Sequence, residues 1–273
     1  MFVAVPRVDS HGMDTNFTNA VIVVTGASKG IGLAVSQAFA AAGAFVIAGA
    51  RHNSPELQAL EAAGSATFIA ADLATAEGPR TLLAAAAERG GVDVLVNNAG
   101  AVATRFGGIL SVTDEEWAAA LSVNFLSAVR ATREAIPQML TRGGGAIVMI
   151  GSVNATLPEP NIVDYSATKA ALANYAKSLS KEFGPKGIRV NTISPGPVST
   201  DLWLAEDGVA AKFAAASGAT ADDVVASVSA GAPTGRFTTP QEVADLTVFL
   251  ASSRSGNTTG ADVRIDGGYV PTV

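Results

Sequence analysis

The hydrophobic positions of the chain form short β-branched runs that alternate with longer helical stretches. The run Val21–Val24 is typical of a strand that is buried on both faces of a parallel sheet. Similar runs recur to the end of the chain, so the predicted strands are residues 21–24, 45–48, 66–70, 92–96, 146–150, 189–194 and 262–265. Strands that alternate with helices predict a single doubly wound α/β domain of the Rossmann type, with a seven-stranded parallel sheet and helices on both faces.

Helix start signals fall in the intervals between these strands. Ser54 before Pro55 is typical of an N-cap followed by proline at the first helical position. Thr113 and Thr239 each begin a capping box, with a glutamate three residues later. The predicted helices are residues 33–39, 55–63, 79–89, 113–140, 165–183 and 239–251.

Two segments depart from this alternation. Residues 1–18 are irregular and polar, with a second methionine at Met13, and we expect a poorly ordered leader outside a domain of residues 19–273. Between about residues 197 and 235 the pattern weakens to apolar islands in a stretch rich in alanine and glycine. Because ligands bind beyond the carboxyl ends of the strands in such a sheet, we expect this segment to be a mobile substrate lid. A helical hairpin packed on the edge of the sheet is the alternative.

Composition and charge narrow the functional classes. The chain of 273 residues has a formal net charge of −6, which argues against nucleic acid because that partner needs a basic face. It has no cysteine and two histidines, so thiolate chemistry is excluded and no metal site is indicated. The longest apolar run, Ala38–Ala50, is too short to span a bilayer, and no signal-peptide pattern begins the chain. We expect a cytoplasmic protein without a membrane partner.

A glycine-rich turn, Thr25–Gly32, joins the first strand to the first helix. The start of a helix offers unpaired N–H groups and partial positive charge, and glycines let the backbone approach a ligand closely, so such a turn can cradle a phosphate. The spacing is G-x-x-x-G-x-G rather than the commoner G-x-G-x-x-G. Taken alone, the turn is as easily an ordinary loop as a binding site.

The residues after the second strand favour a phosphorylated dinucleotide. A NAD site usually has an acid about twenty residues past the glycine turn, but Ala48–Asn53 contains none, and Arg51 lies where the acid would be. Lys29 lies within the turn itself. Two cations suit a 2′-phosphate, so we expect NADP(H), with NAD(H) possible. The alternative is that both are ordinary surface cations.

Two further strand ends carry polar groups that suit a cofactor. Asp72 follows the third strand and is expected to accept a bond from an adenine amino group, a role compatible with a plain helix cap. The segment Asn97–Gly100 ends the fourth strand. Its side-chain amides are expected to bond neighbouring backbone while Gly100 keeps the surface flat; an asparagine-rich turn is the alternative.

A candidate acid–base group lies in the second half of the chain. Tyr165 and Lys169 are four residues apart in a predicted helix and share a face, and Ser152 follows the fifth strand. A tyrosine has a reference pKa of about 10, and a nearby ammonium lowers it, so that the phenol exchanges protons near neutrality. Ser152 would hold the substrate oxygen. The combination with the upstream glycine turn is specific, although a Tyr-x-x-x-Lys pair alone is not.

With these motifs in place, the chain resembles the short-chain dehydrogenase/reductase family over about residues 20–268. The matching pieces are Thr25–Gly32, Asp72-Leu73, Asn97–Gly100, Asn124, Ser152, Tyr165–Lys169, Pro195-Gly196 with Val198 and Thr200, and Asp266–Gly268.

The resemblance implies a role for each of four catalytic residues. Tyr165 would be the general acid/base, and Ser152 would position the carbonyl or alcohol. Lys169 would lower the pKa of the tyrosine and bond the nicotinamide ribose, and Asn124 would hold a water that relays protons to Lys169. The implied reaction is hydride transfer between a nicotinamide and a carbonyl or secondary alcohol.

The resemblance also implies the residues that bind NADP(H). Pro195–Val198 would lie along the nicotinamide, and Thr200 would contact its amide or phosphate. The expected cofactor-binding residues are Gly26, Ser28, Lys29, Gly30, Ile31, Gly32, Arg51, Asp72, Leu73, Asn98, Ala99, Gly100, Val123, Tyr165, Lys169, Pro195, Gly196, Val198 and Thr200.

The substrate itself is less clearly indicated. Asn154, Leu157, Trp203, Leu204 and Phe213 lie near the catalytic edge or in the lid, and they predict a mostly apolar pocket with one amide. We therefore expect a small, neutral, fairly hydrophobic ketone or secondary alcohol; Trp203 is as readily a packing residue. The alternatives are a β-ketoacyl-acyl-carrier-protein type of reductase, an NAD(H)-using alcohol dehydrogenase of the same family and, more remotely, a non-catalytic NADP(H)-binding sensor.

The family resemblance suggests a homotetramer, or a homodimer. The predicted helices 113–140 and 165–183 would pack against their symmetry mates, because alanine-rich faces permit close helix approach. These faces could equally pack on the sheet of the same chain.

Overall fold

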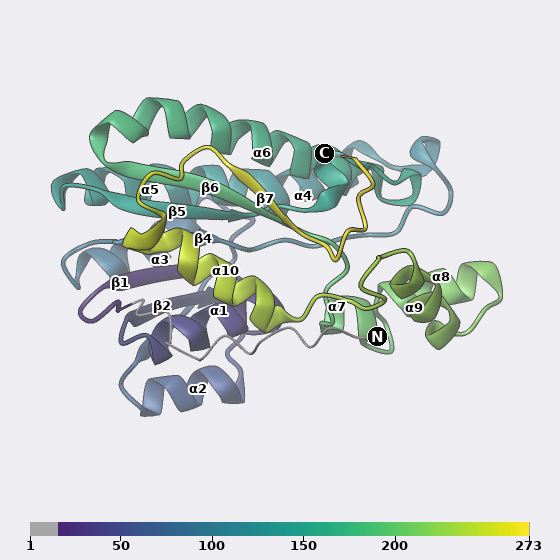
Figure 1. Cartoon of the computed structure of the whole chain (residues 1–273), viewed down its shortest axis with the longest axis horizontal. Helices are drawn as coiled ribbons and strands as arrows, with labels where there is room; N and C mark the ends of the chain where they lie inside the picture. The colour runs from purple at the N-terminus through teal and green to yellow at the C-terminus, as the bar shows by residue number, and fades with distance from the viewer. Residues whose placement is uncertain (1–15, 273) are drawn as a thin grey trace, which may run out of the picture.

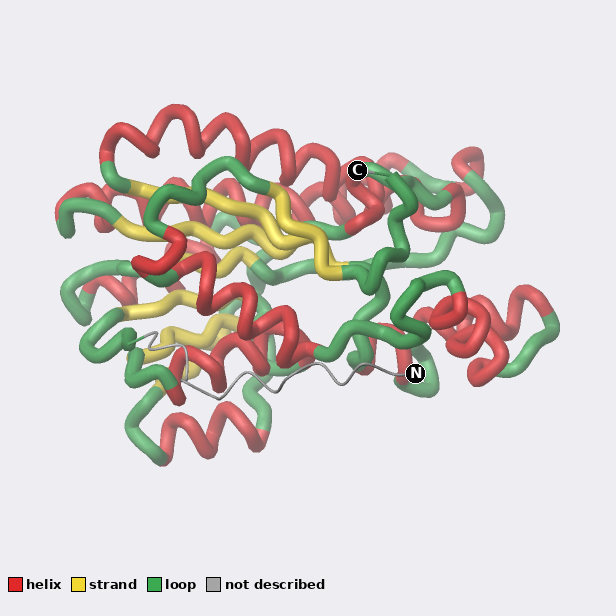
Figure 2. Tube along the Cα trace, in the orientation of Figure 1, coloured by secondary structure: helices red, strands yellow, loops and turns green. Residues whose placement is uncertain are grey.

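The β-branched runs form one parallel sheet in the computed structural model, which describes residues 16–272. The strand order is β3-β2-β1-β4-β5-β6-β7, and Figure 2 shows the strands as the central layer. The predicted fold class and all seven predicted strands are confirmed. The strands are β1 (Val21–Thr25), β2 (Phe45–Ala50), β3 (Ala66–Ala70), β4 (Val94–Asn97), β5 (Gly145–Ile150), β6 (Ile188–Pro195) and β7 (Asp262–Ile265).

Helices cover both faces of the sheet (Figure 1). Alternate residues of β1 point to opposite faces: Ile22 belongs to the core beneath α1, α2 and α10, and Val23 to the core beneath α3, α5 and α6. The helices of the first layer are α1 (Gly30–Ala41), α2 (Pro55–Ala62) and α10 (Pro240–Ala251), and those on the other side are α3 (Glu77–Ala87), α4 (Asp114–Leu121), α5 (Ser127–Thr141) and α6 (Val163–Phe183). Short 3₁₀ turns are η1 (Ile109–Ser111), η3 (Val153–Ala155), η4 (Pro160–Ile162), η5 (Gly184–Lys186) and η6 (Ser253–Ser255).

The helix predicted over residues 113–140 is not continuous. A π-helical segment, η2 (Ser122–Leu126), separates α4 from α5. The side chain of Asn124 is buried here; its amide donates to the carbonyl oxygen of Ala120 (3.1 Å) and its Oδ1 accepts from the backbone of Ala101 (2.9 Å). The wider turn thus rotates an asparagine inward, and π-segments of this kind occur frequently at functional sites.

The segment of residues 197–235, here called the lid segment, is mostly helical. It contains α7 (Asp201–Leu204), α8 (Val209–Ser217) and α9 (Ala221–Ala230). These helices project beyond the carboxyl ends of the strands in Figure 1, and α8 packs on α9 as a hairpin. The hairpin of the alternative prediction is therefore present, but it lies beyond the strand ends rather than flat on the edge of the sheet. Its mobility stays a prediction.

The packed domain begins slightly earlier than predicted. Most of the expected leader, residues 1–15, lies outside the described residues. Phe17, however, is buried against Phe39 of α1 with ring centroids 5.0 Å apart, and its backbone N–H donates to Ala42. Asn16–Thr18 thus belong to the domain, since an aromatic ring buried on α1 is part of its core. None of the helices in residues 16–272 is long and apolar enough to cross a membrane.

Candidate active site

The glycine turn and the end of β4 lie side by side at the carboxyl edge of the sheet. β1 and β4 are neighbours there, at the point where the strand order reverses, which is where a doubly wound sheet binds its ligand. The hydroxyl of Thr25 accepts the backbone N–H groups of Asn98 (2.8 Å) and Ala99 (3.0 Å). The amide of Asn98 donates in return to the carbonyl oxygens of Thr25 and Gly26.

The prediction for the asparagine pair is therefore confirmed for one member. Asn98 bonds the backbone across the sheet. Asn97 instead points into the core, where its amide donates to the hydroxyl of Thr132 (3.1 Å) and lies 3.2 Å from the sulfur of Met149. Side chains of successive strand residues point to opposite faces, which explains the difference.

The glycines of the turn are required by close approaches. A β-carbon on Gly32 would lie 2.2 Å from the carbonyl oxygen of Gly26, so only glycine lets α1 start this close to the turn. Gly30 has a φ of +55°, and a β-carbon on it would lie 3.3 Å from the methyl group of Thr200. The turn thus faces the segment that follows β6. A phosphate bound at the turn would therefore lie beside Thr200.

The start of α1 is suited to an anion. Among residues 16–272 no side chain caps its first turn, and the turn contains no acidic residue, so its N–H groups and the helix dipole are open to a phosphate. Lys29 at the N-cap and Arg51 after β2 are both exposed. Their charge and exposure are compatible with an additional phosphate on a bound dinucleotide.

Two predicted adenine contacts follow β3. Asp72 is exposed, and its Oδ1 accepts from the backbone N–H of Ala74 (3.0 Å). This bond closes a local turn and is not the helix cap that the sequence offered as a compatible alternative, because the N-cap of α3 is Ala76. Leu73 beside it is buried.

Two of the predicted catalytic residues, Asn124 and Lys169, lie close together beside Gly100. A β-carbon on Gly100 would be 3.0 Å from Oδ1 of Asn124 and 3.6 Å from Nζ of Lys169. Lys169 is buried and donates to the carbonyl oxygen of Ile150 (2.8 Å). Burial lowers the pKa of Lys169 to about 8, so most of the lysine still carries its charge at neutral pH. Val123 lies beside Asn124 in η2 and is partly buried.

The structure corrects the prediction for the pKa of Tyr165. Burial raises that pKa above its usual value, and a hydrogen bond with Ser152 opposes the rise. Lys169 does not reverse this shift: its Nζ lies 5.6 Å from the centroid of the tyrosine ring and is bonded to Ile150. Without cofactor, Tyr165 is therefore a protonated phenol at neutral pH.

Ser152 is held in place by Asn154. The hydroxyl of Ser152 donates to Oδ1 of Asn154 and accepts its backbone N–H, both at 3.1 Å, and the amide of Asn154 donates to the carbonyl oxygen of Leu157 (3.0 Å). The side chain of Asn154 thus orients Ser152, in contrast to the free amide expected in the wall of the substrate pocket. Ser152 itself is buried after β5, as predicted for the catalytic edge.

The segment after β6 is fixed by the end of the chain. A β-carbon on Gly196 would lie 2.9 Å from Cβ of Asp266, and its backbone N–H donates to Ile265. Val198 is buried and forms a bridge with Thr238. Pro195, Gly196, Val198 and Thr200 are therefore consecutive parts of one fixed edge that leads into the lid segment.

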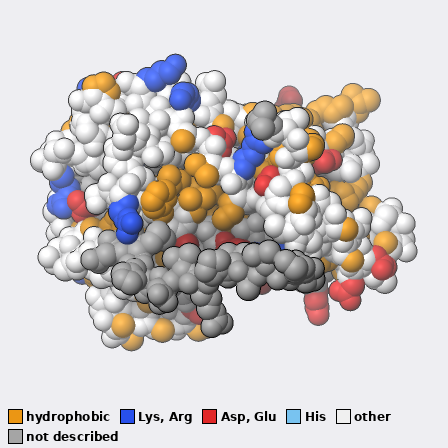
Figure 3. Space-filling view, in the orientation of Figure 1, with side chains coloured by type: hydrophobic (Ala, Val, Ile, Leu, Met, Phe, Trp, Pro, Cys, Tyr) orange, Lys and Arg blue, Asp and Glu red, His pale blue; other side chains and the backbone are white. Residues whose placement is uncertain are grey.

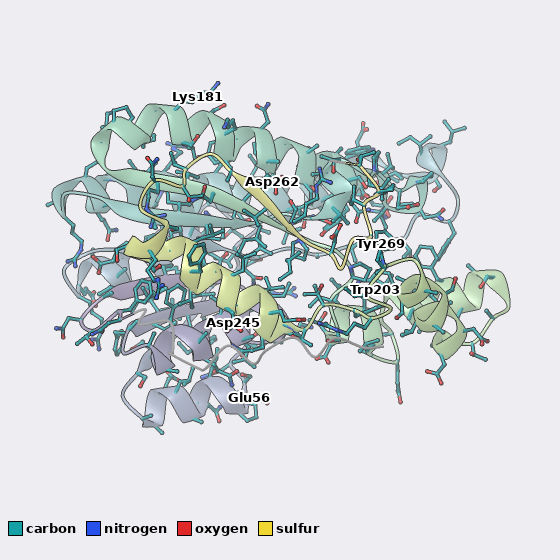
Figure 4. All side chains as sticks on the ribbon, viewed as in Figure 1. Glu56, Lys181, Trp203, Asp245, Asp262 and Tyr269 are labelled. Atoms are coloured by element: carbon teal, nitrogen blue, oxygen red, sulfur yellow. The ribbon has the colours of Figure 1, made fainter. Side chains whose placement is uncertain are left out.

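The predicted substrate residues of the lid segment have different surroundings. Trp203, which is labelled in Figure 4, packs on the buried ring of Phe237 with ring centroids 5.3 Å apart, and this favours the packing role. Phe213 of α8 packs edge-on against Phe106 (5.1 Å). Leu204 is about half exposed. Phe213 thus contacts the loop that follows Gly100.

Sequence reasoning missed several residues of this edge. The glycine-turn motif includes Thr25 but does not indicate a role for it. In the structure, the hydroxyl of Thr25 bonds the turn to the end of β4. Arg105 and Phe106 lie in the loop between β4 and α4, where Arg105 forms an ion pair with Asp164, the residue before Tyr165. The sequence signal that could have indicated this ion pair is the charged residue Asp164, directly before Tyr165. Residues 16–272 contain no group of three acidic or histidine side chains placed to hold a metal ion.

Three comparisons, with a family model, with similar sequences and with solved structures, agree with the family resemblance of the sequence. A family model described as "Enoyl-(Acyl carrier protein) reductase" matches residues 26–270. The chain is 37% identical over 270 residues to the D-threitol dehydrogenase of Mycolicibacterium smegmatis, covering 95% of this chain and 96% of that protein. It is 35% identical over 258 residues to the 3-oxoacyl-(acyl-carrier-protein) reductase of Escherichia coli K12, covering 93% and 98%. The solved L-sorbose reductase of Gluconobacter frateurii, complexed with NADPH and L-sorbose, aligns with a TM-score of 0.87 and 35% identity, covering 96% of this chain and all of that one.

Proposed function

The chain belongs to the short-chain dehydrogenase/reductase family, and from this premise we propose that it reduces a neutral, largely apolar ketone with NADPH. It is an NAD(P)-dependent oxidoreductase that transfers hydride between a nicotinamide and a carbonyl or secondary alcohol. The observation that carries the proposal is the meeting of Lys169, Asn124 and Gly100 at the sheet edge that also holds the glycine turn.

NADP(H) would be held by the glycine turn and the edges around it. The open first turn of α1 takes the pyrophosphate, and Lys29 with Arg51 takes the 2′-phosphate, because both are exposed cations and Ala48–Asn53 has no acid. Relatives solved with NADPH or NADP support use of this cofactor. Asp72 and Leu73 would border the adenine; the remaining members are Gly26, Ser28, Gly30, Ile31, Gly32, Asn98, Ala99, Gly100, Val123, Pro195, Gly196, Val198 and Thr200.

The catalytic roles follow from the protonation states at the site. When bound, NADPH supplies the hydride that is added to the carbonyl carbon. Tyr165 has a pKa raised by burial, so it holds a proton at neutral pH and donates it to the developing alkoxide oxygen. Ser152, oriented by Asn154, holds the same oxygen. Lys169 bonds the ribose, and Asn124 positions the water that returns a proton toward Lys169.

The direction of the reaction is consistent with this state of Tyr165. Reduction needs a phenol that donates a proton, whereas oxidation needs a phenolate. The phenol is the form that burial favours in the protein without cofactor. In the reduction direction, Tyr165 therefore already holds the proton that it donates near neutral pH.

The apolar surroundings of the site entrance support the substrate class. The loop before α4 exposes Phe106, Ile109 and Leu110, and α7 exposes Leu202 and Leu204. Figure 3 shows hydrophobic side chains gathered at this end of the molecule. Desolvating such groups favours an apolar ketone over a polyol, even though two similar proteins are named for a polyol and a sugar.

An acyl-carrier-protein substrate is the second candidate, because several similar proteins are named for it. Docking of an acidic carrier would require a basic patch at the entrance. The helices α7–α9 and their connections instead carry Asp201, Glu206, Asp207, Asp222 and Asp223 against Lys212 alone. Like charges at an interface suppress binding, so the charge at the entrance favours a free ketone.

We also propose that the protein is a cytoplasmic homotetramer. The exposure of the helices expected at the subunit interface supports this proposal in part. Ala176 of α6 is buried in the core of its own domain, but Ala170 of α6 and Leu140 of α5 are exposed. Sedimentation of the purified protein distinguishes a tetramer from a dimer.

The function is tested by following NADPH and NADH oxidation against a panel of carbonyl compounds. The panel contains apolar ketones, sugars such as L-sorbose, and β-ketoacyl thioesters. We expect the highest kcat/KM with an apolar ketone and NADPH. Faster turnover of a sugar or a thioester would overturn the substrate class, and faster turnover with NADH would overturn the cofactor preference. Tight NADPH binding without turnover of any member would favour the sensor.

A further inference from the structure

The guanidinium of Arg105 connects two helices at the catalytic edge. Its Nε and Nη2 both donate to Oδ2 of Asp164 in α6, at 3.1 and 2.6 Å, and its Nη1 donates to Glu116 of α4. The side chain of Arg105 is 12% exposed and that of Asp164 is 2% exposed. Charge pairs this well shielded are specific in geometry, because an unpaired member would lose its hydration without a replacement.

Asp164 acts directly on the backbone of Tyr165. Its Oδ1 accepts the backbone N–H of Tyr165 at 2.9 Å, while its Oδ2 holds Arg105. The N-cap position of α6 is occupied by Ile162, which has no polar side chain to bond the first turn. Asp164 takes over this function from within the helix, and its negative charge is favourable at a helix start. The first turn of α6, which carries the acid–base tyrosine, is thus held by Asp164.

Arg105 also belongs to the loop that surrounds the site entrance. Its backbone N–H donates to the carbonyl oxygen of Asn161 (2.7 Å), immediately before α6. The same loop begins at Ala101, whose N–H is bonded by Asn124 (2.9 Å). Phe106, the residue after Arg105, packs on Phe213 of the lid segment. Figure 1 shows that the loop, between β4 and α4, lies at the same end of the molecule as α8.

We propose that Arg105 and Asp164 are positioning residues that align Tyr165 and connect it to the Phe106–Phe213 contact of the lid segment. The proposal rests on the proposed reductase function, because it assigns the pair to the proton-donating step. Neither residue touches the reacting atoms. The guanidinium already pairs with two carboxylates through its Nε, Nη1 and Nη2 atoms, so its charge is directed to Asp164 and Glu116.

The test compares Arg105→Gln, Arg105→Lys, Asp164→Asn and the double variant R105Q/D164N with the wild type. Arg142→Gln is the matched control: it also removes an arginine paired with an aspartate, Asp93 (2.7 Å), but one that lies before β4, at the opposite end of the strand. We expect kcat to fall by about tenfold to a hundredfold in the single Gln and Asn variants, because small misplacements of a reacting group are costly. The Kd for NADPH is expected to stay within about twofold.

Two further readouts separate positioning from general stability. Arg105→Lys is expected to recover part of kcat, since a lysine keeps the charge but not both contacts. The double variant is expected to be no slower than the worse single variant, because both residues act in one network. R142Q is expected to keep kcat whatever its melting temperature.

A readout without turnover keeps the inference independent of the substrate. The chain has three tyrosines, so a protein labelled with carbon-13 at the phenolic carbon gives three resonances, and Tyr165→Phe assigns that of Tyr165. We expect this resonance to shift in R105Q and D164N, with those of Tyr175 and Tyr269 unchanged. An unshifted Tyr165 resonance, or melting temperatures that fall while kcat stays at the wild-type value, would overturn the proposal. A shifted resonance in a protein that turns over no ketone would contradict the proposed function alone.

Discussion

Thr25 and Asn98 bond each other reciprocally although they are 73 residues apart in the chain. The hydroxyl of Thr25 accepts the backbone N–H of Asn98 at 2.8 Å, and the side-chain amide of Asn98 donates to the carbonyl oxygen of Thr25 at 2.9 Å. The pair fixes the glycine turn against the end of β4, where the strand order reverses. The shape of the proposed phosphate cradle thus depends on a contact between two strand ends.

Removal of the Thr25 hydroxyl is expected to weaken NADPH binding. Thr25→Val leaves the N–H groups of Asn98 and Ala99 without their acceptor, which costs about 1–3 kcal/mol. We expect the Kd for NADPH, measured by titration calorimetry, to rise about tenfold. Thr25→Ser keeps the hydroxyl and is expected to stay within about threefold of the wild type. An unchanged Kd in the valine variant would show that the turn holds its shape without this contact.

Arg51 and Lys29 are expected to set the preference for NADPH. Arg51→Gln or Lys29→Gln removes a cation from the proposed 2′-phosphate site, so kcat/KM for NADPH is expected to fall by about tenfold, or roughly 1.4 kcal/mol. The value for NADH is expected to stay within about twofold. Lys181→Gln removes an exposed charge at the far end of α6 (Figure 4) and controls for net charge. Equal losses with both cofactors would contradict the assignment.

The charge of Lys169 is expected to make stability depend on pH. Burial lowers its pKa from 10.5 to about 8, so between these values the unfolded chain binds more protons than the folded protein. Stability therefore rises with pH in this interval. At 1.36 kcal/mol per pKa unit the charged lysine costs about 3 kcal/mol at neutral pH, and roughly 1 kcal/mol of that is recovered by pH 9.

Urea unfolding without cofactor measures this effect. The wild type is expected to gain stability relative to Lys169→Met as the pH rises from 7 to 9. Lys177→Met, on an exposed turn of the same helix, removes a lysine equally and is expected to show a constant difference from the wild type. A constant difference for Lys169→Met as well would show that its pKa is not lowered by burial.

The contact between Phe106 and Phe213 is expected to affect binding of the substrate more than chemistry. Aromatic pairs of this geometry contribute about 0.5–1.5 kcal/mol beyond their buried area. Phe213→Ala is therefore expected to raise KM for an apolar ketone by about threefold to tenfold, with kcat and the Kd for NADPH little changed. Phe106→Ala is expected to act alike, and the double variant to be no worse than either. Strict additivity would show that the two rings act separately.

The parts of the protein that could be predicted from sequence are those with a local signal. The central strands could be predicted because each is a run of mostly buried apolar residues, as in β1, whereas the edge strands β3 and β7 are only partly buried. Tyr165 and Lys169 could be predicted because their spacing fixes a shared helix face. The capping boxes at Thr113 and Thr239 begin α4 and α10 as predicted.

The remaining features depend on contacts between distant residues. Arg105 and Asp164 are 59 positions apart, and no periodicity relates them. The inward turn of Asn124 arises from a π-segment, which adds a residue to a helical turn without changing the hydrophobic pattern. The pKa of Tyr165 depends on how deeply the fold buries the phenol. The spacing between Tyr165 and Lys169 in the sequence does not predict this burial.

The most direct test of the whole account is turnover in Tyr165→Phe with binding measured on the same protein. Tyr175→Phe, on the same helix, is the matched control. We predict that Tyr165→Phe binds NADPH with a Kd within about twofold of the wild type but reduces the ketone at least about a hundredfold more slowly, while Tyr175→Phe keeps its rate. Wild-type turnover by Tyr165→Phe would contradict the assignment of the proton donor and, with it, the function proposed for this site.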